Sequence, residues 1–279
     1  MWKRIAAARR WRRILAASRL DPRRLKRPVD EPGPRDFILA GCPRTGTSLL
    51  TAMLHQPPNI VTVMEPWDGL RMPPAELFSS LREEIVNTGE LSRGRLDLDA
   101  LREGRVEWQQ DGERAYPIEV AETFELGVKW PTFWQYLELL PTTRFLITLR
   151  DPVEVISSFR RVGGRLEQGL DYDVVFNEPM NRELMAASDD IAVRRALLYQ
   201  YINSRLLPYL DKDNVFVVRY ERWFSDPDRL RREISRFLEV PFAESNVAIR
   251  EEPRRQEAAA VIDLVREHVP VRLDLGYDV

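Results

Sequence analysis

The sequence is poor in the residues that form disulfides and bind metals. Its 279 residues include one Cys and two His. One Cys cannot form a disulfide within the chain, and one Cys with two His is too few for a zinc site built from these residues. We therefore expect a protein of a reducing compartment, the cytoplasm, whose chemistry depends on carboxylates, Lys, Arg and hydroxyl groups.

Long apolar runs and an excess of one charge sign are also missing. No stretch reaches the roughly 18 consecutive apolar residues that a membrane-spanning helix needs. Lys and Arg number 42 against 44 Asp and Glu, so a net charge of -2 provides no overall attraction to nucleic acid. The 44% of hydrophobic residues is enough to build a core. We expect a soluble globular protein with no nucleic-acid partner.

Basic residues are concentrated at one end of the chain. Residues 1–27 carry eleven Lys and Arg against a single acid, Asp21, and no uninterrupted apolar segment of a secretory signal follows them. We interpret residues 1–34 as a basic, solvated arm that ends in a Pro-rich linker, and residues 35–279 as a single domain. Weak contact with an anionic membrane surface is the alternative role of the arm.

Short apolar runs alternate with helical patterns along the predicted domain. Strand-like runs cover residues 37–40, 60–64, 126–129, 145–149 and 215–219, and helical patterns cover residues 47–54, 133–140, 153–159 and 230–238. This alternation predicts an α/β fold with a central, mainly parallel sheet and helices on both faces. Two charged inserts, residues 71–114 and 163–188, are interpreted either as substrate-facing loops or as surface decoration.

The most informative segment is FILAGCPRTGTSLL, residues 37–50. A strand that enters a loop bounded by Gly41 and Gly46, followed by a helix, directs free backbone N–H groups at one point that favours an anion. The spacing is close to the P-loop G-x-x-x-x-G-K-[ST], but Thr47 occupies the Lys position and the nearest cation is Arg44. A nucleotide with a single phosphate group at this point would not need that Lys.

GCPRTGTSLL resembles the 5′-phosphosulfate loop of sulfotransferases that use 3′-phosphoadenosine 5′-phosphosulfate (PAPS). A second segment, FLITLRDPVEVISSF at residues 145–159, resembles the 3′-phosphate motif of the same family, with Arg150 and Ser158 at the matching positions. Arg150 at the end of a strand and Ser158 on the next helix can converge on one phosphate. An ion pair of Arg150 with Asp151 or Glu154 is the structural alternative.

The resemblance implies a P-loop-like three-layer fold and a set of donor-binding residues. Lys129 matches the Lys near the transferring sulfuryl group, and Tyr220 matches a tyrosine that packs beside the adenine. The family's C-terminal Arg/Gly-rich segment is not recognisable, and Arg250, Arg254 and Arg255 are candidates to replace it. The implied PAPS-binding residues are Arg44, Thr45, Gly46, Thr47, Ser48, Leu49, Arg150, Ser158 and Tyr220, and the product is adenosine 3′,5′-bisphosphate.

The implied reaction is in-line transfer of a sulfuryl group to a hydroxyl acceptor without a metal, with Arg44 and Lys129 balancing the charge on the transferred and departing oxygens. Many cytosolic members use a His shortly after the Lys, but Trp130 and Pro131 stand there. Glu65, at the end of the second strand, is the predicted base, and this resembles the tyrosylprotein and carbohydrate branch. A salt bridge from Glu65 to Arg44 is the alternative, with Asp68 as a reserve base.

Two other functions compete with this hypothesis. One is a P-loop kinase acting on a small metabolite, and the other is a catalytically silent binding module on the same scaffold. The acceptor is expected to be a small molecule, a carbohydrate or a lipid, and nothing in the sequence indicates the oligomeric state. His55 and Cys42 are interpreted as structural residues, and His268 as a surface residue of a late charged helix.

Overall fold

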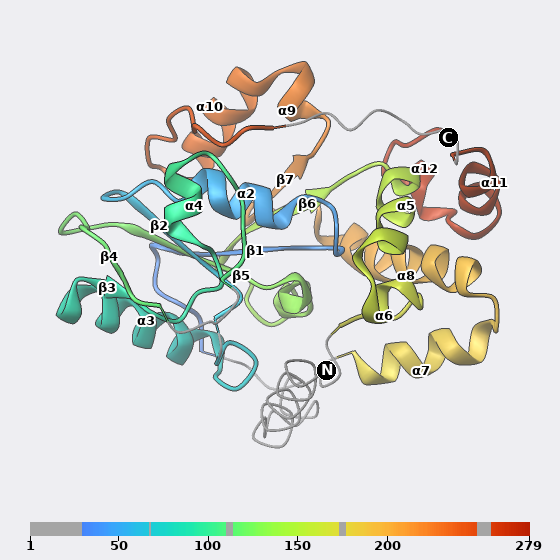
Figure 1. Cartoon of the computed structure of the whole chain (residues 1–279), viewed down its shortest axis with the longest axis horizontal. Coiled ribbons are helices and arrows are strands. Elements are labelled where there is room, and N and C mark those ends of the chain that lie inside the picture. The colour runs from blue at the N-terminus through green and yellow to red at the C-terminus, as the bar shows by residue number, and fades with distance from the viewer. Residues whose placement is uncertain (1–29, 67, 110–113, 173–176, 250–257) are drawn as a thin grey trace.

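The computed structural model describes residues 30–66, 68–109, 114–172, 177–249 and 258–279 (Figure 1). Most of the predicted basic arm therefore lies outside the described residues, as do Arg250, Arg254 and Arg255. In the part of the chain that is described, none of the helices combines the length and the apolar character that crossing a membrane requires.

A five-stranded parallel sheet forms the centre of the molecule. Its strands are β1 (Asp36–Gly41), β2 (Ile60–Met64), β5 (Glu125–Lys129), β6 (Arg144–Leu149) and β7 (Val215–Arg219), in the spatial order β2-β5-β1-β6-β7. Each neighbouring pair is parallel. All five predicted strands are confirmed, with ends within one residue of the expected positions.

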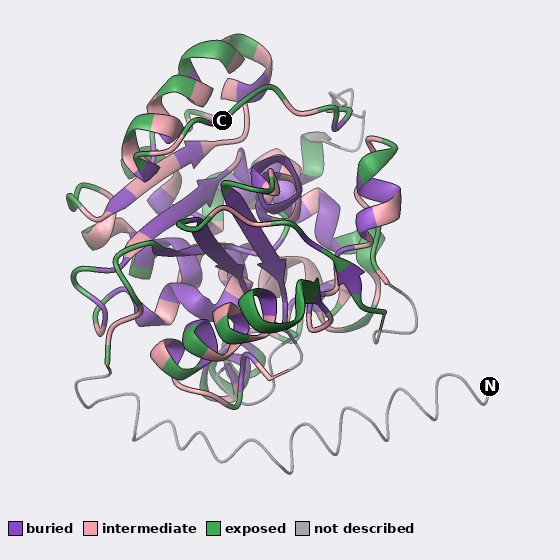
Figure 2. Ribbon diagram, turned by 90° about the vertical axis from the view of Figure 1, so that its left-hand side faces the viewer, coloured by how far each residue is buried: buried purple, intermediate pink, exposed green. Residues whose placement is uncertain are grey.

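Strands of this sheet are covered on both sides. Every residue of β1, β2 and β5 is buried, as is typical of parallel strands packed between two layers of helices. Figure 2 shows the strands as a buried centre surrounded by helices whose outer surfaces are exposed. The predicted three-layer α/β architecture is confirmed.

Helices connect the strands, and a second, two-stranded antiparallel sheet lies at the periphery. Helix α2 packs on β1, β2 and β5, α8 packs on β1, and α10 packs on β7. The helices are α2 (Thr47–Leu54), α3 (Pro74–Thr88), α4 (Leu98–Arg102), α5 (Pro152–Val162), α6 (Gly164–Glu167), α7 (Glu178–Ala187), α8 (Ile191–Leu206), α9 (Arg222–Ser225), α10 (Pro227–Leu238), α11 (Ala258–His268) and α12 (Val271–Asp274), with 3-10 turns η2 (Pro131–Tyr136) and η3 (Leu207–Tyr209) and the small strands β3 (Glu90–Leu91) and β4 (Tyr116–Pro117).

The predicted α-helix over residues 133–140 differs from the structure. This segment forms the 3-10 helix η2 and then separate turns. Phe133, Tyr136, Leu137 and Leu140 are nevertheless all buried. Successive tight turns bring side chains three or four residues apart to the same side, so the apolar spacing reports burial here and not a continuous α-helix.

The two charged inserts are only partly helical. Helices α3 and α4 account for part of residues 71–114, and an extended segment between them runs beside β2, where the N–H of Arg95 donates to the carbonyl of Met64 at 2.7 Å. The second insert contains α6 and α7. Residues 30–35 of the expected linker are also attached to the domain, because Glu31 accepts hydrogen bonds from the N–H groups of Thr142 and Thr143.

Candidate active site

The carboxyl ends of the five parallel strands lie along one edge of the sheet, and each of them brings a candidate residue. In the spatial order of the strands these are Glu65 after β2, Lys129 at the end of β5, the loop with Arg44 after β1, Arg150 after β6 and Tyr220 after β7. The loop at the start of α2 therefore stands between a Glu65–Lys129 side and an Arg150–Tyr220 side. Ligands of open α/β sheets bind in this position.

Two glycines allow the loop after β1 to pack tightly. Gly41 has a φ of 149°, and a Cβ at that position would lie 2.7 Å from the carbonyl oxygen of Thr148. Gly46 has a φ of 102°, and its Cβ would lie 2.7 Å from a ring carbon of Tyr220. Any larger residue at Gly46 would therefore collide with Tyr220, so the ring and the loop form one surface.

Thr45 anchors this loop to the neighbouring strand. Its hydroxyl donates to the carbonyl of Cys42 at 2.7 Å and lies 2.6 Å from the hydroxyl of Thr148. The Thr45 side chain is buried. The N–H of Thr45 also donates to the Cys42 carbonyl, at 3.3 Å, so both the side chain and the backbone of Thr45 hold the loop in shape. Arg44, next to it, is exposed and has a positive φ of 74°.

Helix α2 begins without a side-chain cap. Its N-cap residue is Gly46, and no side chain bonds to the first turn. The N–H groups of Thr47, Ser48 and Leu49 have no partner within the helix, because the preceding turn is not helical. Together with the positive end of the helix dipole, these groups suit a phosphate or sulfate.

Lys129 joins the start of α2 to Glu65. Its ammonium group donates to Glu65 Oε1 at 2.6 Å and to the Ser48 hydroxyl at 3.2 Å. The Lys129 side chain is only 2% exposed. Burial lowers the pKa of Lys129 from its usual value, Glu65 opposes this, and the nearby guanidinium groups of Arg95 and Arg44 lower it further. A cation is thus held at the point where the loop, β5 and β2 meet.

Glu65 lies between two cations. Arg95 Nη1 is 3.3 Å from Glu65 Oε2, on the side opposite to the Lys129 contact. The predicted alternative was a salt bridge to Arg44, whereas the ion pairs that Glu65 forms are with Lys129 and Arg95. Glu65 also has a φ of 48°, in the left-handed region that residues with a side chain rarely adopt. Such backbone strain is concentrated at functional positions.

The Arg44 side chain points to the other side of the loop. Arg44 Nε donates to the hydroxyl of Ser158 on α5 at 2.9 Å, and Ser158 is buried. Arg150 lies with its guanidinium carbon 4.2 Å from the centre of the Tyr220 ring. Arg150 is also 3.6 Å from Glu154, so the ion pair considered as its structural alternative is present. Arg44 thus meets Ser158, and Arg150 meets Tyr220, whose ring also lies beside Gly46 of the loop.

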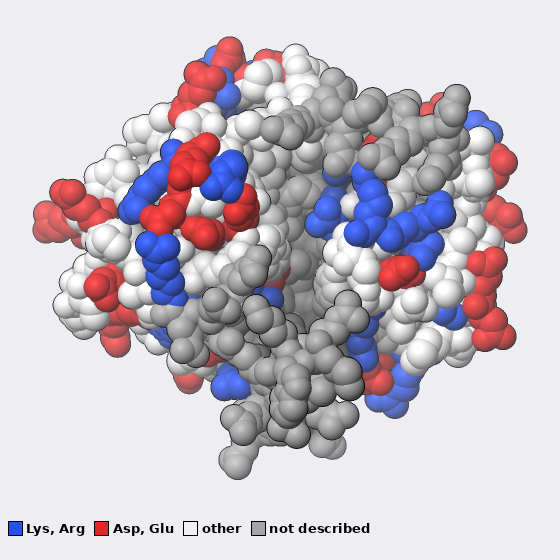
Figure 3. Space-filling model, viewed as in Figure 1, with Lys and Arg blue, Asp and Glu red and all other residues white. Residues whose placement is uncertain are grey.

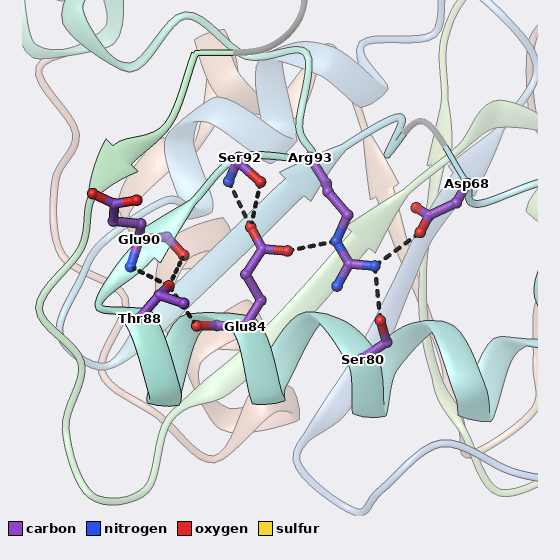
Figure 4. Close-up of polar contacts among 7 residues, drawn as sticks. All are labelled: Asp68, Ser80, Glu84, Thr88, Glu90, Ser92 and Arg93. Atoms are coloured by element: carbon purple, nitrogen blue, oxygen red, sulfur yellow. Dashed lines mark hydrogen bonds and ion pairs between the residues drawn. The ribbon is translucent and has the colours of Figure 1, made fainter.

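Asp68, the reserve base, is part of a separate polar network (Figure 4). Arg93 donates to Asp68 Oδ2 at 2.8 Å, to the Ser80 hydroxyl at 2.8 Å and to Glu84 at 2.5 Å. Ser80 and Glu84 belong to α3, so Arg93 ties the chain after β2 to that helix. This arrangement gives Asp68 a structural role.

A cavity of about 690 Å³ opens beside Glu65 and Lys129. Figure 3 shows this face of the molecule hollowed between the regions of α4 and α5. Both charged inserts contribute to the walls, as expected of substrate-facing loops. The residues that line the cavity are Pro43, Arg44, Thr47, Ser48, Glu65, Leu70, Arg95, Trp108, Lys129, Trp130, Pro131, Thr132, Val162, Gly164, Arg165, Leu166, Asp171 and Tyr172. Arg150, Ser158 and Tyr220 are not in its lining.

The lining residues that the sequence did not single out include Arg95, Trp108 and Tyr172. No motif contains them. Two of them had a signal in the sequence, because Trp108 and Tyr172 each stand directly between two polar residues. In the structure Trp108 is 43% and Tyr172 42% exposed. Arg95 had no such signal, because the segment that carries it is one of many with alternating charge.

Neither the half-buried His55 nor the buried Cys42 lines this cavity. His55 Nδ1 is 3.2 Å from the N–H of Thr62, and burial lowers the pKa of His55 to about 4. Burial also raises the pKa of the Cys42 thiol. A neutral His and an un-ionised thiol are consistent with the structural roles expected for them.

Several solved structures are similar to this chain in fold. The sulfotransferase domain from the curacin biosynthetic pathway is 17% identical, covers 89% of this chain and 99% of that one, and has a TM-score of 0.48. The sulfotransferase domain from the Synechococcus PCC 7002 olefin synthase is 18% identical, with 91% and 98% covered and a TM-score of 0.45. A sulfotransferase from Alicyclobacillus acidocaldarius is 18% identical, with 90% and 98% covered and a TM-score of 0.41.

No curated protein matches the sequence. Residues 36–244, by contrast, match the sulfotransferase family. The matched region begins at β1 and includes every strand of the central sheet and all five candidate residues at their carboxyl ends. Since the match extends over well over half of its 279 residues, the chain belongs to the sulfotransferase family.

Proposed function

We propose that this sulfotransferase moves the sulfuryl group of PAPS to a hydroxyl acceptor, with Glu65 as the base. The observation that supports this most strongly is the chain of contacts from Ser48 through Lys129 to Glu65. It joins an anion-binding helix end to a carboxylate inside one cavity. A sulfuryl group transferred at this point would lie beside the cation Lys129 and the carboxylate Glu65, on the side from which the hydroxyl acceptor enters.

The donor would bind across the loop. In the proposal, the N–H groups at the start of α2 and Arg44 bind the 5′-phosphosulfate, Arg150 and Ser158 bind the 3′-phosphate, and the adenine lies beside Tyr220. These residues fit such a ligand, because they combine donors and cations in one place and Gly46 leaves no side chain between the loop and the Tyr220 ring. The hydrogen bond between Arg44 and Ser158 would open as the phosphates enter.

The proposed transfer needs a proton acceptor and charge balance. The acceptor oxygen forms a bond to sulfur while the bond from sulfur to the 5′-phosphate oxygen breaks, and that oxygen keeps the electron pair. Glu65 takes the proton of the acceptor hydroxyl, since a carboxylate within reach of a hydroxyl can act as a general base. Lys129 and Arg44 balance the negative charge on the sulfuryl and leaving oxygens. The group carries a single negative charge, so these cations suffice and no metal is required.

Calorimetry with adenosine 3′,5′-bisphosphate tests the donor. We expect binding without magnesium. Ser158→Ala should weaken it by roughly tenfold or more, the usual effect of losing a hydrogen bond to a charged group. Ser157→Ala is the matched control, because Ser157 is the neighbouring residue of α5 and precedes the motif position. Binding of ATP with magnesium and no binding of the bisphosphate would show that the donor is a nucleoside triphosphate.

Turnover of labelled PAPS with a panel of hydroxyl acceptors tests the base. Glu65→Gln should lower kcat by roughly 100-fold or more, the usual contribution of a general base, and leave the affinity for the bisphosphate unchanged. Wild-type kcat in Glu65→Gln would assign the base to another group. Absence of turnover with every acceptor, despite tight bisphosphate binding, would favour a silent binding module.

A further inference from the structure

We infer that the acceptor is an uncharged molecule with a largely apolar body and one reacting hydroxyl. This inference rests on the proposed function and narrows its substrate class. The inference depends on the residues that line the cavity together with Glu65 and Lys129. Arg150, Ser158 and Tyr220, which are proposed to bind the 3′-phosphate and the adenine, do not line it. The space is therefore available to the acceptor.

Apolar side chains from separate parts of the chain line the cavity. These residues are Leu70, Trp108, Trp130, Val162, Leu166 and Tyr172. They come from the segments after β2 and β5, from the end of α5 and from the two inserts, so no single helical pattern explains their common direction. An assembly of this kind is typical of a pocket for an apolar ligand.

Three of these wall residues are exposed although they are large and apolar. Among the described residues, six large apolar side chains are exposed, and Trp108, Val162 and Tyr172 are three of those six. The other three are Val86, Met185 and Leu273, which lie outside this lining. Exposed apolar groups that gather at one cavity indicate a surface that a ligand covers.

Six charged residues line the cavity: Arg44, Arg95, Lys129, Arg165, Glu65 and Asp171. Glu65 is paired with both Lys129 and Arg95. In the proposed function Arg44 and Lys129 balance the charge of the donor, and the two remaining cations, Arg95 and Arg165, equal in number the two acids, Glu65 and Asp171. With the donor bound, an anionic or cationic acceptor would therefore meet no excess charge of opposite sign. An uncharged molecule loses less hydration free energy on entering such a site.

Aromatic rings reach the reacting centre itself. The ammonium group of Lys129 is 5.3 Å from the centre of the Trp108 ring, and the guanidinium carbon of Arg95 is 6.0 Å from the Trp130 ring. The apolar wall thus begins directly beside the place proposed for the hydroxyl. A hydroxyl attached to an apolar body could then reach Glu65 while the body covers the rings.

Two hydroxyl groups of the cavity lining already take part in hydrogen bonds. The hydroxyl of Thr132 already accepts a hydrogen bond from Asn177 at 2.7 Å, and that of Ser48 accepts one from Lys129 at 3.2 Å. A sugar would bring several hydroxyls that each need a partner when they leave water. The volume of about 690 Å³ also suits a compact molecule of the size of typical small ligands.

Calorimetry with acceptor analogues at saturating adenosine 3′,5′-bisphosphate tests this inference without requiring turnover. The probes are 4-methyl-, 4-butyl- and 4-hexylphenol, with methyl glucoside and 4-hydroxybenzoate as the polar and the charged probe. We expect Kd to fall by roughly threefold to fourfold for each added methylene, the usual effect of burying one such group. The glucoside and the benzoate should bind more weakly than 4-butylphenol.

Two matched variants locate the effect. Val162→Ser should raise the Kd of 4-hexylphenol about threefold or more, because it replaces an apolar wall residue. Val86→Ser makes the same change at an exposed position of α3 outside the lining and should leave Kd unchanged. Trp108→Ala should have a larger effect than Val162→Ser.

The outcomes separate this inference from the proposed function. If the bisphosphate fails to bind, the donor proposal fails and this inference with it. If the bisphosphate binds but Kd is independent of alkyl length, or the glucoside or the benzoate binds more tightly than 4-butylphenol, the apolar acceptor is wrong while the donor proposal stands. If Kd falls with alkyl length but Val162→Ser and Val86→Ser have equal effects on it, the apolar site lies outside this cavity.

Discussion

Replacing Glu65 by Gln would leave a nearly buried ammonium group without its closest counter-ion. Lys129 is 2% exposed and 2.6 Å from Glu65, whereas Glu65 is 11% exposed and also contacts Arg95 at 3.3 Å. The two ends of this ion pair are therefore not equivalent. Removal of Glu65 strands a buried cation, and removal of Lys129 leaves a carboxylate that still has a cationic partner.

The expected destabilisation follows this asymmetry. Breaking a buried ion pair by removing one partner costs roughly 3 kcal/mol or more, so we expect a loss of this size for Glu65→Gln. Lys129→Met keeps most of the side-chain volume in an apolar form and leaves Glu65 with Arg95, so we expect a loss of about 1 kcal/mol or less. The double variant should resemble Lys129→Met, because the stranded ammonium group is then gone.

Urea denaturation followed by circular dichroism measures these losses at pH 7.5. A loss for Lys129→Met as large as that for Glu65→Gln would refute the reasoning. The pH adds a second check. Burial lowers the folded-state pKa of Lys129 below its unfolded value, so the unfolded chain binds more protons between the two values and stability rises with pH there. Glu65 opposes that lowering, so the deficit of Glu65→Gln should shrink as the pH is raised toward 10.

Two further predictions concern His55 and Arg95. Burial lowers the pKa of His55 from 6.5 to about 4. Between these values the unfolded chain binds a proton that the folded chain does not, so the free energy of unfolding should fall as the pH falls from about 6.5 to 4, by roughly 3 kcal/mol at about 1.4 kcal/mol per pH unit. His55→Asn keeps an acceptor for the N–H of Thr62 and should make the urea midpoint depend less on pH over this range. An unchanged pH dependence would show that His55 does not cause it. Arg95→Met should lower kcat at least tenfold with bisphosphate affinity unchanged, because Glu65 loses the contact that orients it. Arg93→Met, two residues away, should affect stability and not kcat; equal loss of kcat in both would show that the whole segment and not Arg95 is required.

The sheet was predictable because parallel strands are buried on both faces. Such strands appear in the sequence as continuous apolar runs, and residues 60–64 and 215–219 match β2 and β7 without any shift. Helix α8 was not predicted, because its apolar residues are interspersed with charged ones that the structure places at its surface. Residues 133–140 show the opposite case, in which a helical spacing arises from tight turns.

The contacts of the site were less predictable than its residues. The sequence indicated that Glu65, Lys129 and Arg44 end or follow strands, but it contained no information on the order of those strands in space. Because β5 lies between β2 and β1, Glu65 meets Lys129 before it can reach Arg44. Arg95 reaches Glu65 from an extended segment that has no local sequence pattern. Only the tertiary structure therefore reveals the ion pair between Arg95 and Glu65.

The order of the strands also has a consequence for how such an enzyme can change. The nucleotide-side residues Arg150 and Tyr220 follow β6 and β7, at one edge of the sheet, while Glu65, Leu70 and the first insert with Trp108 follow β2 at the other. Insertions and substitutions at the β2 edge can therefore accumulate without disturbing the residues proposed to bind the nucleotide. A library restricted to the walls at Leu70 and Trp108 would search acceptors while keeping one donor, and natural variation has the same freedom.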